Sequence, residues 1–183
     1  MRRNRLKYKR GDSSTIKPER CIAERPIPAN KRERIGDWEG DTMHGARGTG
    51  CIVTCVDRKT RYLTVAKSQG YDAISVNEAL AEALKGKPSI TMTLDRGSEF
   101  ARFKELEKQL ELSVYFADAH APWQRGSNEN INGLIRFFLP KGTDFSKLTP
   151  EYLEWIVELI NTRPRKCLGW LSPKEVFLAK CCT

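Results

Sequence analysis

The order of strand-like and helix-like runs is the feature that most restricts the fold of this 183-residue chain. Three runs rich in β-branched and aromatic residues come first, at residues 35–43, 50–57 and 61–67. Such runs are typical of strands, and the short links between them predict an antiparallel meander. After them, segments with a helical spacing of apolar residues alternate with shorter strand-like runs. This order indicates an α/β domain.

Two more strands, each flanked by helices, complete the expected sheet. The strands are predicted at 90–95 and 113–116, and the helices at about 73–85, 99–110 and 128–138. Strands that are joined through a helix run parallel to one another. We therefore expect a mixed five-stranded sheet with helices packed on its faces.

Two helix starts are marked near the C-terminus. Thr149 precedes a proline and opens one helix, and the segment SPKE at 172–175 forms a capping box with proline at the first helical position. Trp155 and Trp170 are interpreted as core residues, because tryptophan is mostly buried.

Basic charge is concentrated at the N-terminus. The net charge is +9, and residues 1–34 hold 12 Lys/Arg against 4 Asp/Glu, a net of +8. We interpret residues 1–34 as a basic arm or linker and residues 35–183 as the folded domain. A basic arm suits a polyanion such as nucleic acid, although a disordered tail without a fixed partner remains an alternative. The cations expected to contact DNA are Arg2, Arg3, Arg5, Lys7, Lys9 and Arg10.

The apolar residues give no sign of a membrane protein. No run approaches the roughly 18 to 20 consecutive apolar residues of a membrane span. The N-terminus is charged from Arg2 onward and has no apolar core of a signal peptide. We expect an intracellular protein without a membrane partner.

Three acidic residues lie where a predicted strand runs or ends, or where a helix begins. Asp41 lies in the first strand, Asp95 ends the fourth, and Glu129 lies in the first turn of the helix at 128–138, with Ser127 as its expected N-cap. If the two strands are neighbours, the three carboxylates can converge on metal ions, which stabilise charge in phosphodiester chemistry. Spacing alone leaves alternatives open, since Asp95 also suits a turn and Glu129 suits a helix N-terminus.

Several longer segments resemble D-D-E transposases built around insertion sequence thirty. They are DWEGD at 37–41, DRKTRY at 57–62, LDRGSE at 94–99, APWQRGSNENING at 121–133, PKGTD at 140–144 and NTRPRKCLGW at 161–170. The resemblance runs from about Ile35 to Phe177. Fifty-three residues separate Asp41 from Asp95 and thirty-three separate Asp95 from Glu129, which fits an integrase-like pattern. Leu94 and Ala121 depart from the family, which commonly has an aromatic and a serine there.

The resemblance implies a ribonuclease H-like fold with Asp41, Asp95 and Glu129 as catalytic residues and metal ligands. Mg²⁺ or Mn²⁺ is the implied cofactor, with two ions expected when DNA is bound. The implied reaction is cleavage at the end of a mobile element, followed by attack of the freed 3′-hydroxyl on target DNA. Alternatives are a nuclease of the same fold and an inactive fragment that only binds DNA.

The resemblance also implies partners and a location. Transposon ends and target DNA are the expected partners, in a homo-oligomer, and the protein is expected in the cytoplasm at the bacterial nucleoid. The family usually begins with a helix-turn-helix region, which we expect to be absent or cut off here. Expected DNA contacts in the domain are Trp123, Gln124, Arg125, Asn128, Arg136, Arg163, Arg165 and Lys166. For Trp123, packing beneath its loop is an equal alternative to stacking on a base.

Overall fold

The protein is described by a computed structural model that covers residues 16–118 and 121–181. The six arm cations expected to contact DNA, between Arg2 and Arg10, lie outside the described residues. No helix among the described residues is long and apolar enough to cross a membrane.

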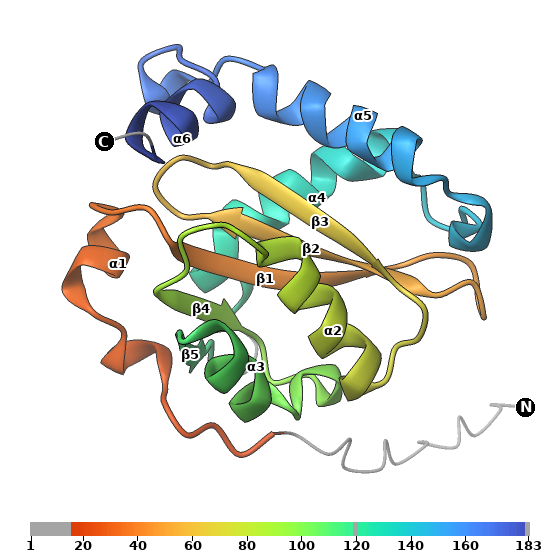
Figure 1. The fold of residues 1–183 in the computed structure, drawn as a ribbon, viewed down its shortest axis with the longest axis horizontal. Coiled ribbons are helices and arrows are strands. Elements are labelled where there is room, and N and C mark those ends of the chain that lie inside the picture. The colour runs from red at the N-terminus through yellow and green to blue at the C-terminus, as the bar shows by residue number, and fades with distance from the viewer. Residues whose placement is uncertain (1–15, 119–120, 182–183) are drawn as a thin grey trace, which may run out of the picture.

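A mixed five-stranded sheet forms the centre of the domain, as the element order predicts (Figure 1). Its strands are β1 (Asp37–His44), β2 (Cys51–Asp57), β3 (Leu63–Ser68), β4 (Thr91–Leu94) and β5 (Ser113–Phe116), in the spatial order β3-β2-β1-β4-β5. The first three strands are antiparallel, whereas β4 runs parallel to both β1 and β5.

The pairing of β1 with β4 brings two predicted site residues to the same region of the sheet. Glu39 of β1 lies opposite Thr93 of β4 in parallel register. Asp41 lies two residues after Glu39, and Asp95 lies two residues after Thr93. Both aspartates therefore reach the same end of the β1–β4 pair. Because side chains alternate between the two faces of a strand, Glu39 and Asp41 also lie on the same face of β1.

Helices cover both faces of the sheet (Figure 1). One apolar core joins the sheet to α2 (Ala73–Leu84) and α3 (Phe103–Leu110). The other joins the opposite face to α4 (Gly126–Phe138) and α5 (Pro150–Thr162). Alternation along β2 supplies both cores, because Val53 faces the first and Ile52 and Val56 face the second.

Residues 16–34 differ from the extended arm that the sequence predicts. They contain a 3₁₀ turn (Ile22–Glu24) and the short helix α1 (Ile27–Lys31), and Cys21 forms a bridge with Phe116 of β5. Ala29 is fully buried, and its carbonyl accepts a 2.9 Å hydrogen bond from Arg58. This segment therefore packs on the sheet and belongs structurally to the domain.

The helix caps are partly as predicted. Thr149 caps α5 through the backbone N–H of Tyr152, and Ser172 with Glu175 forms the expected capping box of α6 (Pro173–Cys181). Trp155 and Trp170 are not core residues: they are 50% and 68% exposed. Trp155 instead stacks on Tyr152 at the surface of α5, with ring centroids 5.6 Å apart.

Candidate active site

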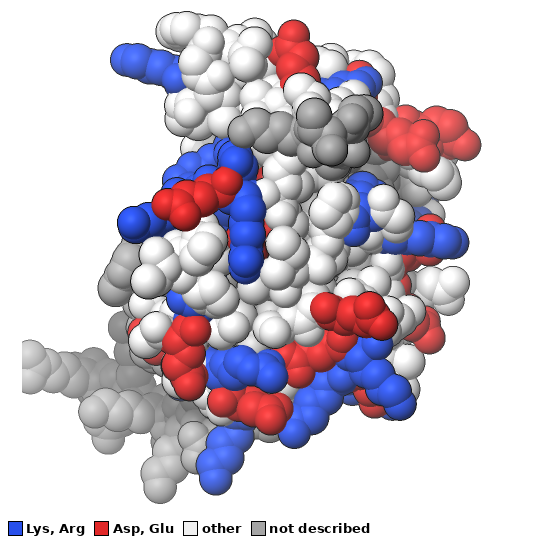
Figure 2. Space-filling view, turned by 60° about the vertical axis from the view of Figure 1, so that its left-hand side comes forward, with Lys and Arg blue, Asp and Glu red and all other residues white. Residues whose placement is uncertain are grey.

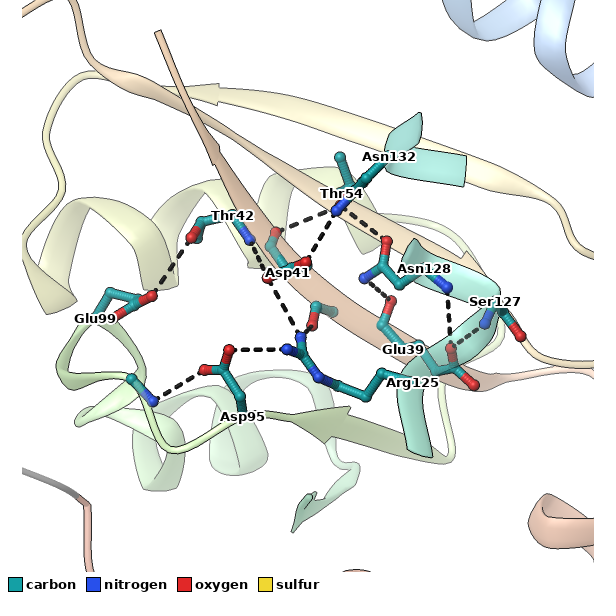
Figure 3. A network of polar contacts seen from close by, with 12 residues as sticks. Glu39, Asp41, Thr42, Thr54, Asp95, Glu99, Arg125, Ser127, Asn128 and Asn132 are labelled. Atoms are coloured by element: carbon teal, nitrogen blue, oxygen red, sulfur yellow. Dashed lines mark hydrogen bonds and ion pairs between the residues drawn. The ribbon is translucent and has the colours of Figure 1, made fainter. Parts of the chain in front are cut away.

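Asp41 and Asp95 meet around one arginine side chain (Figure 3). Arg125 Nη1 lies 3.3 Å from Asp41 Oδ1, and Arg125 Nη2 lies 2.9 Å from Asp95 Oδ2. The same guanidinium donates a 3.1 Å hydrogen bond to the carbonyl oxygen of Gly40. Arg125 comes from the 3₁₀ turn that leads into α4, so three distant segments of the chain converge here.

The environment of Asp41 disfavours its charged form. Burial raises the pKa of the Asp41 carboxyl above its ordinary value, and the positive charge of Arg125 opposes that rise. The negative charge of Asp95 raises the same pKa further. A second cation near this pair would therefore favour the ionised form of Asp41.

An amide on α4 fixes the orientation of Asp41. Asn132 Nδ2 donates a 2.9 Å hydrogen bond to Asp41 Oδ2, and the Thr54 hydroxyl lies 3.0 Å from Asn132 Oδ1. The other carboxylate oxygen of Asp41 accepts the backbone N–H of Thr42 at 3.0 Å. Asn132 therefore contacts Asp41 and does not simply face solvent.

Glu39 caps the helix that carries Glu129. Its Oε2 accepts hydrogen bonds from the backbone N–H groups of Ser127 and Asn128, both at 3.1 Å. Its other oxygen pairs with Arg58, and both side chains are almost wholly buried. The predicted cap at Ser127 is wrong, since α4 begins at Gly126 and Ser127 lies inside it.

Sequence reasoning did not assign this role to Glu39. The signal available in the sequence was the spacing of two residues between Glu39 and Asp41, which puts both side chains on the face of β1 that α4 covers. A carboxylate at a helix N-terminus is favoured by the free N–H groups and the helix dipole. Here that carboxylate comes from a strand 88 residues away in sequence.

Glu129 stands apart from the other two predicted carboxylates. It is exposed in the first turn of α4, and no hydrogen bond or ion pair of its side chain occurs within the described part of the chain. No group of three or more His, Cys, Asp or Glu residues in 16–118 and 121–181 is arranged to hold a metal ion. Two of the three predicted ligands are therefore together, and the third lies one helical turn beyond Arg125.

Another acid, Glu99, lies close to Thr42, the residue that follows Asp41 (Figure 3). The Thr42 hydroxyl is 3.4 Å from Glu99 Oε1, and the Tyr71 hydroxyl donates to the same oxygen at 2.5 Å. Burial and then this hydrogen bond raise the pKa of Tyr71. Glu99 was not among the predicted site residues, and it sits in a 3₁₀ turn (Ser98–Phe100) rather than in the predicted helix.

The donor set suits a cation. Two carboxylates and a backbone carbonyl surround the Arg125 guanidinium, which stands in for a positively charged ligand at that point. Oxygen donors of this kind are those that Mg²⁺ and Mn²⁺ prefer. The residues present therefore fit a divalent metal once the guanidinium leaves.

Two residues predicted to contact DNA make hydrogen bonds within the protein, one of them buried and the other at the surface. Asn128 is fully buried, and its Nδ2 donates to the Glu39 carbonyl at 3.1 Å, so it is not available to DNA. Gln124 accepts from the backbone N–H of Asp118 and donates to its carboxylate, which closes the loop before α4.

The remaining predicted DNA contacts occupy different positions. Arg136 donates to the carbonyl of His44 at 2.9 Å. Arg163 and Lys166 are exposed, while Arg165 is half-buried and donates to the carbonyl of Ile160 at 3.3 Å. Trp123 lies in the 3₁₀ turn Pro122–Arg125, and its side chain is outside the described set.

Solved structures with the same fold are retroviral integrase catalytic cores. A chain of the simian T-cell lymphotropic virus intasome, solved with PP2A regulatory subunit B56 gamma, aligns with a TM-score of 0.62 at 18% identity, over 75% of this chain and 52% of that chain. The catalytic core domain of BIV integrase aligns with a TM-score of 0.59 at 16% identity, over 78% of this chain and 93% of that chain. The fold is therefore ribonuclease H-like, as expected.

Several curated proteins with similar sequences are transposases, although no family model matches the chain. The transposase for insertion sequence element IS4351 of Bacteroides fragilis is 43% identical over 85% of this chain and 48% of its own length. Transposase InsI for element IS30A of Escherichia coli K12 is 39% identical over 97% of this chain and 47% of its own length. The chain thus spans about half the length of the curated relatives it matches, and over most of its own length its sequence is similar to transposases of insertion sequence elements such as IS30A, IS4351 and IS1161.

Proposed function

We propose that this chain is the catalytic domain of a transposase, which cuts and joins DNA with metal ions held by Asp41, Asp95 and Glu129. The observation that carries the proposal is the meeting of Asp41 and Asp95 around a cation at one end of the β1–β4 pair. The similarity to transposases over nearly the whole chain supports the same chemistry. Such an enzyme would act on the DNA of the nucleoid.

The protein's own residues prepare the site for this chemistry. Asn132 holds the Asp41 carboxylate in one orientation, and Glu39 anchors the helix from which Glu129 projects. Arg125 balances the two aspartates, and it is placed to contact a DNA phosphate after it leaves them. Bound Mg²⁺ or Mn²⁺ would activate water and stabilise charge on the attacking and leaving oxygens.

Joining would follow from cleavage. The proposed substrates are the ends of a mobile element and a target duplex. Water would release a 3′-hydroxyl at the element's end. That hydroxyl would attack a phosphodiester of the target, and the bond from that phosphorus to the target's 3′-oxygen would break, leaving a 3′-hydroxyl on the target strand. No covalent enzyme intermediate is required, because no protein nucleophile takes part.

An oligonucleotide assay tests the proposal. The protein is incubated with Mn²⁺ and a duplex that carries a pre-cut 3′-hydroxyl end of an element, together with a labelled target. Joined products are expected, and Asp95→Asn should abolish them while Glu82→Gln, an exposed acid on α2, should not. Cleaved but unjoined products would show a nuclease instead, and bound DNA alone would show a binding fragment.

We also propose that the active form is a homo-oligomer that uses an apolar surface on α4 and α5. Phe137 is 83% exposed there, and Tyr152, Trp155 and Leu159 are also exposed. A hydrophobic patch of this kind marks an interface more often than free surface. The structural neighbour from an intasome supports a second copy as its occupant.

Light scattering at several protein concentrations tests the interface. Phe137→Ser with Trp155→Ser should lower the average mass of an oligomer, whereas Ile27→Ser, an exposed apolar residue on α1, should leave it unchanged. A purely monomeric wild-type protein, with and without DNA, would refute the interface.

A further inference from the structure

A basic pocket of about 360 Å³ lies beside the N-terminus of α4. Three arginines from separate segments line it: Arg32 after α1, Arg61 between β2 and β3, and Arg165 between α5 and α6. Ser127 and Asn130 supply polar groups from α4, and no acidic residue of 16–118 or 121–181 lines the pocket. Figure 2 shows one face of the molecule, on which basic and acidic side chains are intermixed.

The positive charges of this pocket are unbalanced. None of its three arginines forms an ion pair with a carboxylate among the described residues. Burial lowers the pKa of Arg32, and repulsion from Arg61 and Arg58 lowers it further. Burial and then Arg163 lower the pKa of Arg165 in the same way. An anion in the pocket would relieve both effects.

A buried donor in the pocket wall also lacks a partner. Arg165 Nε is shielded from solvent and makes no hydrogen bond within the described part of the protein. A buried donor without a partner costs about 1–3 kcal/mol, so such groups are normally satisfied. A ligand oxygen satisfies it only if the Arg165 side chain moves toward the pocket.

Two of the pocket's arginines sit on unusual backbone. Arg32 has φ of 59° and Arg61 has φ of 62°, and only two other non-glycine residues in the described ranges have positive φ. The left-handed region costs a residue with a Cβ about 1 kcal/mol or more. The tight turns that require it present both guanidiniums to the same pocket.

We propose that this pocket binds a backbone phosphate of the DNA strand that the active site cuts or joins. The proposal rests on the proposed function for the identity of the ligand. Guanidinium groups pair with phosphate through two parallel hydrogen bonds, and the pocket offers three such groups.

The pocket and the two aspartates lie on either side of the start of α4. Arg125 reaches Asp41 and Asp95, while the next two residues, Gly126 and Ser127, line the pocket. A helix with its side chains is about 10–12 Å across. A strand held at the aspartates can therefore place one of its neighbouring phosphates in the pocket.

Binding in this pocket would also be communicated to α4. Arg61 donates a hydrogen bond from Nη1 to the Ser127 hydroxyl, in the turn whose N–H groups Glu39 holds. A phosphate bound to Arg61 would thus be connected to α4, the helix that carries Glu129, through the Arg61 side chain.

Binding of a labelled duplex, measured without divalent metal at several salt concentrations, tests the pocket. Arg32→Asn and Arg61→Asn combined should weaken binding about tenfold or more, since charged hydrogen bonds of this kind contribute about 1.5–3 kcal/mol. The slope of log affinity against log salt should fall by about 0.9, the value for one lost phosphate contact. Asparagine is chosen because it tolerates positive φ.

Two controls keep the test decisive. Lys85→Asn removes an exposed cation at the end of α2 and should change neither affinity nor slope beyond the scatter of the wild type. Arg32→Asn alone should keep the wild-type thermal midpoint, because this side chain is only partly covered, and should show part of the loss.

An unchanged slope in the Arg32 and Arg61 double variant would overturn the pocket as a DNA site. Inorganic phosphate that protects the protein thermally while DNA binding stays normal would mean a small-anion site, which also overturns it. Because binding is measured without metal, this failure is separate from failure of the proposed chemistry. Asp95→Asn tests only the latter.

Discussion

Replacing Glu39 with glutamine should destabilise the protein strongly, although the change removes only a charge. Glu39 is fully buried and Arg58 is 4% exposed, so the substitution leaves a buried guanidinium without its counter-ion. It also replaces the charged acceptor of the Ser127 and Asn128 N–H groups with a neutral one.

The magnitude follows from what each contact contributes. Breaking a buried ion pair by removing one partner costs about 3–5 kcal/mol. For a domain of 150–250 residues, each kcal/mol lowers the thermal midpoint by about 2–4 °C. The expected loss is therefore about 6–20 °C, a large part of a total stability that is typically about 5–15 kcal/mol.

Urea unfolding and thermal unfolding, each followed by circular dichroism, measure this loss. Adding Arg58→Met to Glu39→Gln should recover much of it, because the unpaired charge is then gone. The remainder should be about 0.5–2 kcal/mol, the usual contribution of a helix cap. Glu82→Gln, which breaks an exposed pair with Lys85, serves as the matched control and should change stability by less than about 1 kcal/mol.

The reasoning fails if Glu39→Gln unfolds within about 1 kcal/mol of the wild type. It also fails if Arg58→Met makes the Glu39→Gln protein less stable still, since the two side chains would then act independently.

Three further predictions concern the charges around the site and at the N-terminus. Mn²⁺ should raise the thermal midpoint of Arg125→Gln more than that of the wild type, because the guanidinium competes with the metal for Asp41 and Asp95. Equal rises in the wild type and Arg125→Gln would exclude this competition. Burial raises the pKa of Asp41, so the folded metal-free protein binds its proton more tightly than the unfolded chain. The Asp41 carboxyl therefore contributes to the free energy of unfolding below its ordinary pKa, and this contribution is lost as pH rises through the raised pKa. Asp41→Asn should make the urea midpoint less dependent on pH over that range. Deleting residues 1–15, which carry six Lys/Arg and one Asp, should lower the slope of log affinity against log salt for duplex binding. Fluorescence anisotropy measures this slope, and an unchanged value would exclude the arm as an electrostatic site.

Local patterns were sufficient for most of the fold. The predicted strand at 113–116 matches β5, and Thr149 and Ser172 mark their helix starts, because these signals act within a few residues. The alternation of β2 and the order of the elements fixed the mixed sheet. Asp41 and Asp95 meet as predicted because β1 and β4 are neighbours in that sheet.

Long-range contacts and exposed helix faces were not predictable in the same way. Glu39 caps α4 from a distant strand, so no cap signal precedes the helix in sequence. Asn128 belongs to a string typical of an active-site loop, yet the helix begins two residues earlier and turns its amide inward. Trp155 lies on a helix with an apolar stripe, but a stripe does not show which apolar residues other elements cover.

Arg125 links the two ligands that the proposed reaction needs. Its guanidinium holds two carboxylates that would otherwise repel each other, so a divalent metal must displace it before it can use the same oxygens. Displacement is costly while the guanidinium, which is largely buried, has no other anion to contact. A DNA phosphate supplies that anion, and therefore DNA should raise the metal affinity of the site. By linkage, the metal must raise DNA affinity by the same factor, and Arg125→Gln should reduce both effects together. Calorimetric titrations of Mn²⁺ with and without duplex measure that factor, and equal coupling in wild type and Arg125→Gln would show that the arginine does not transmit it.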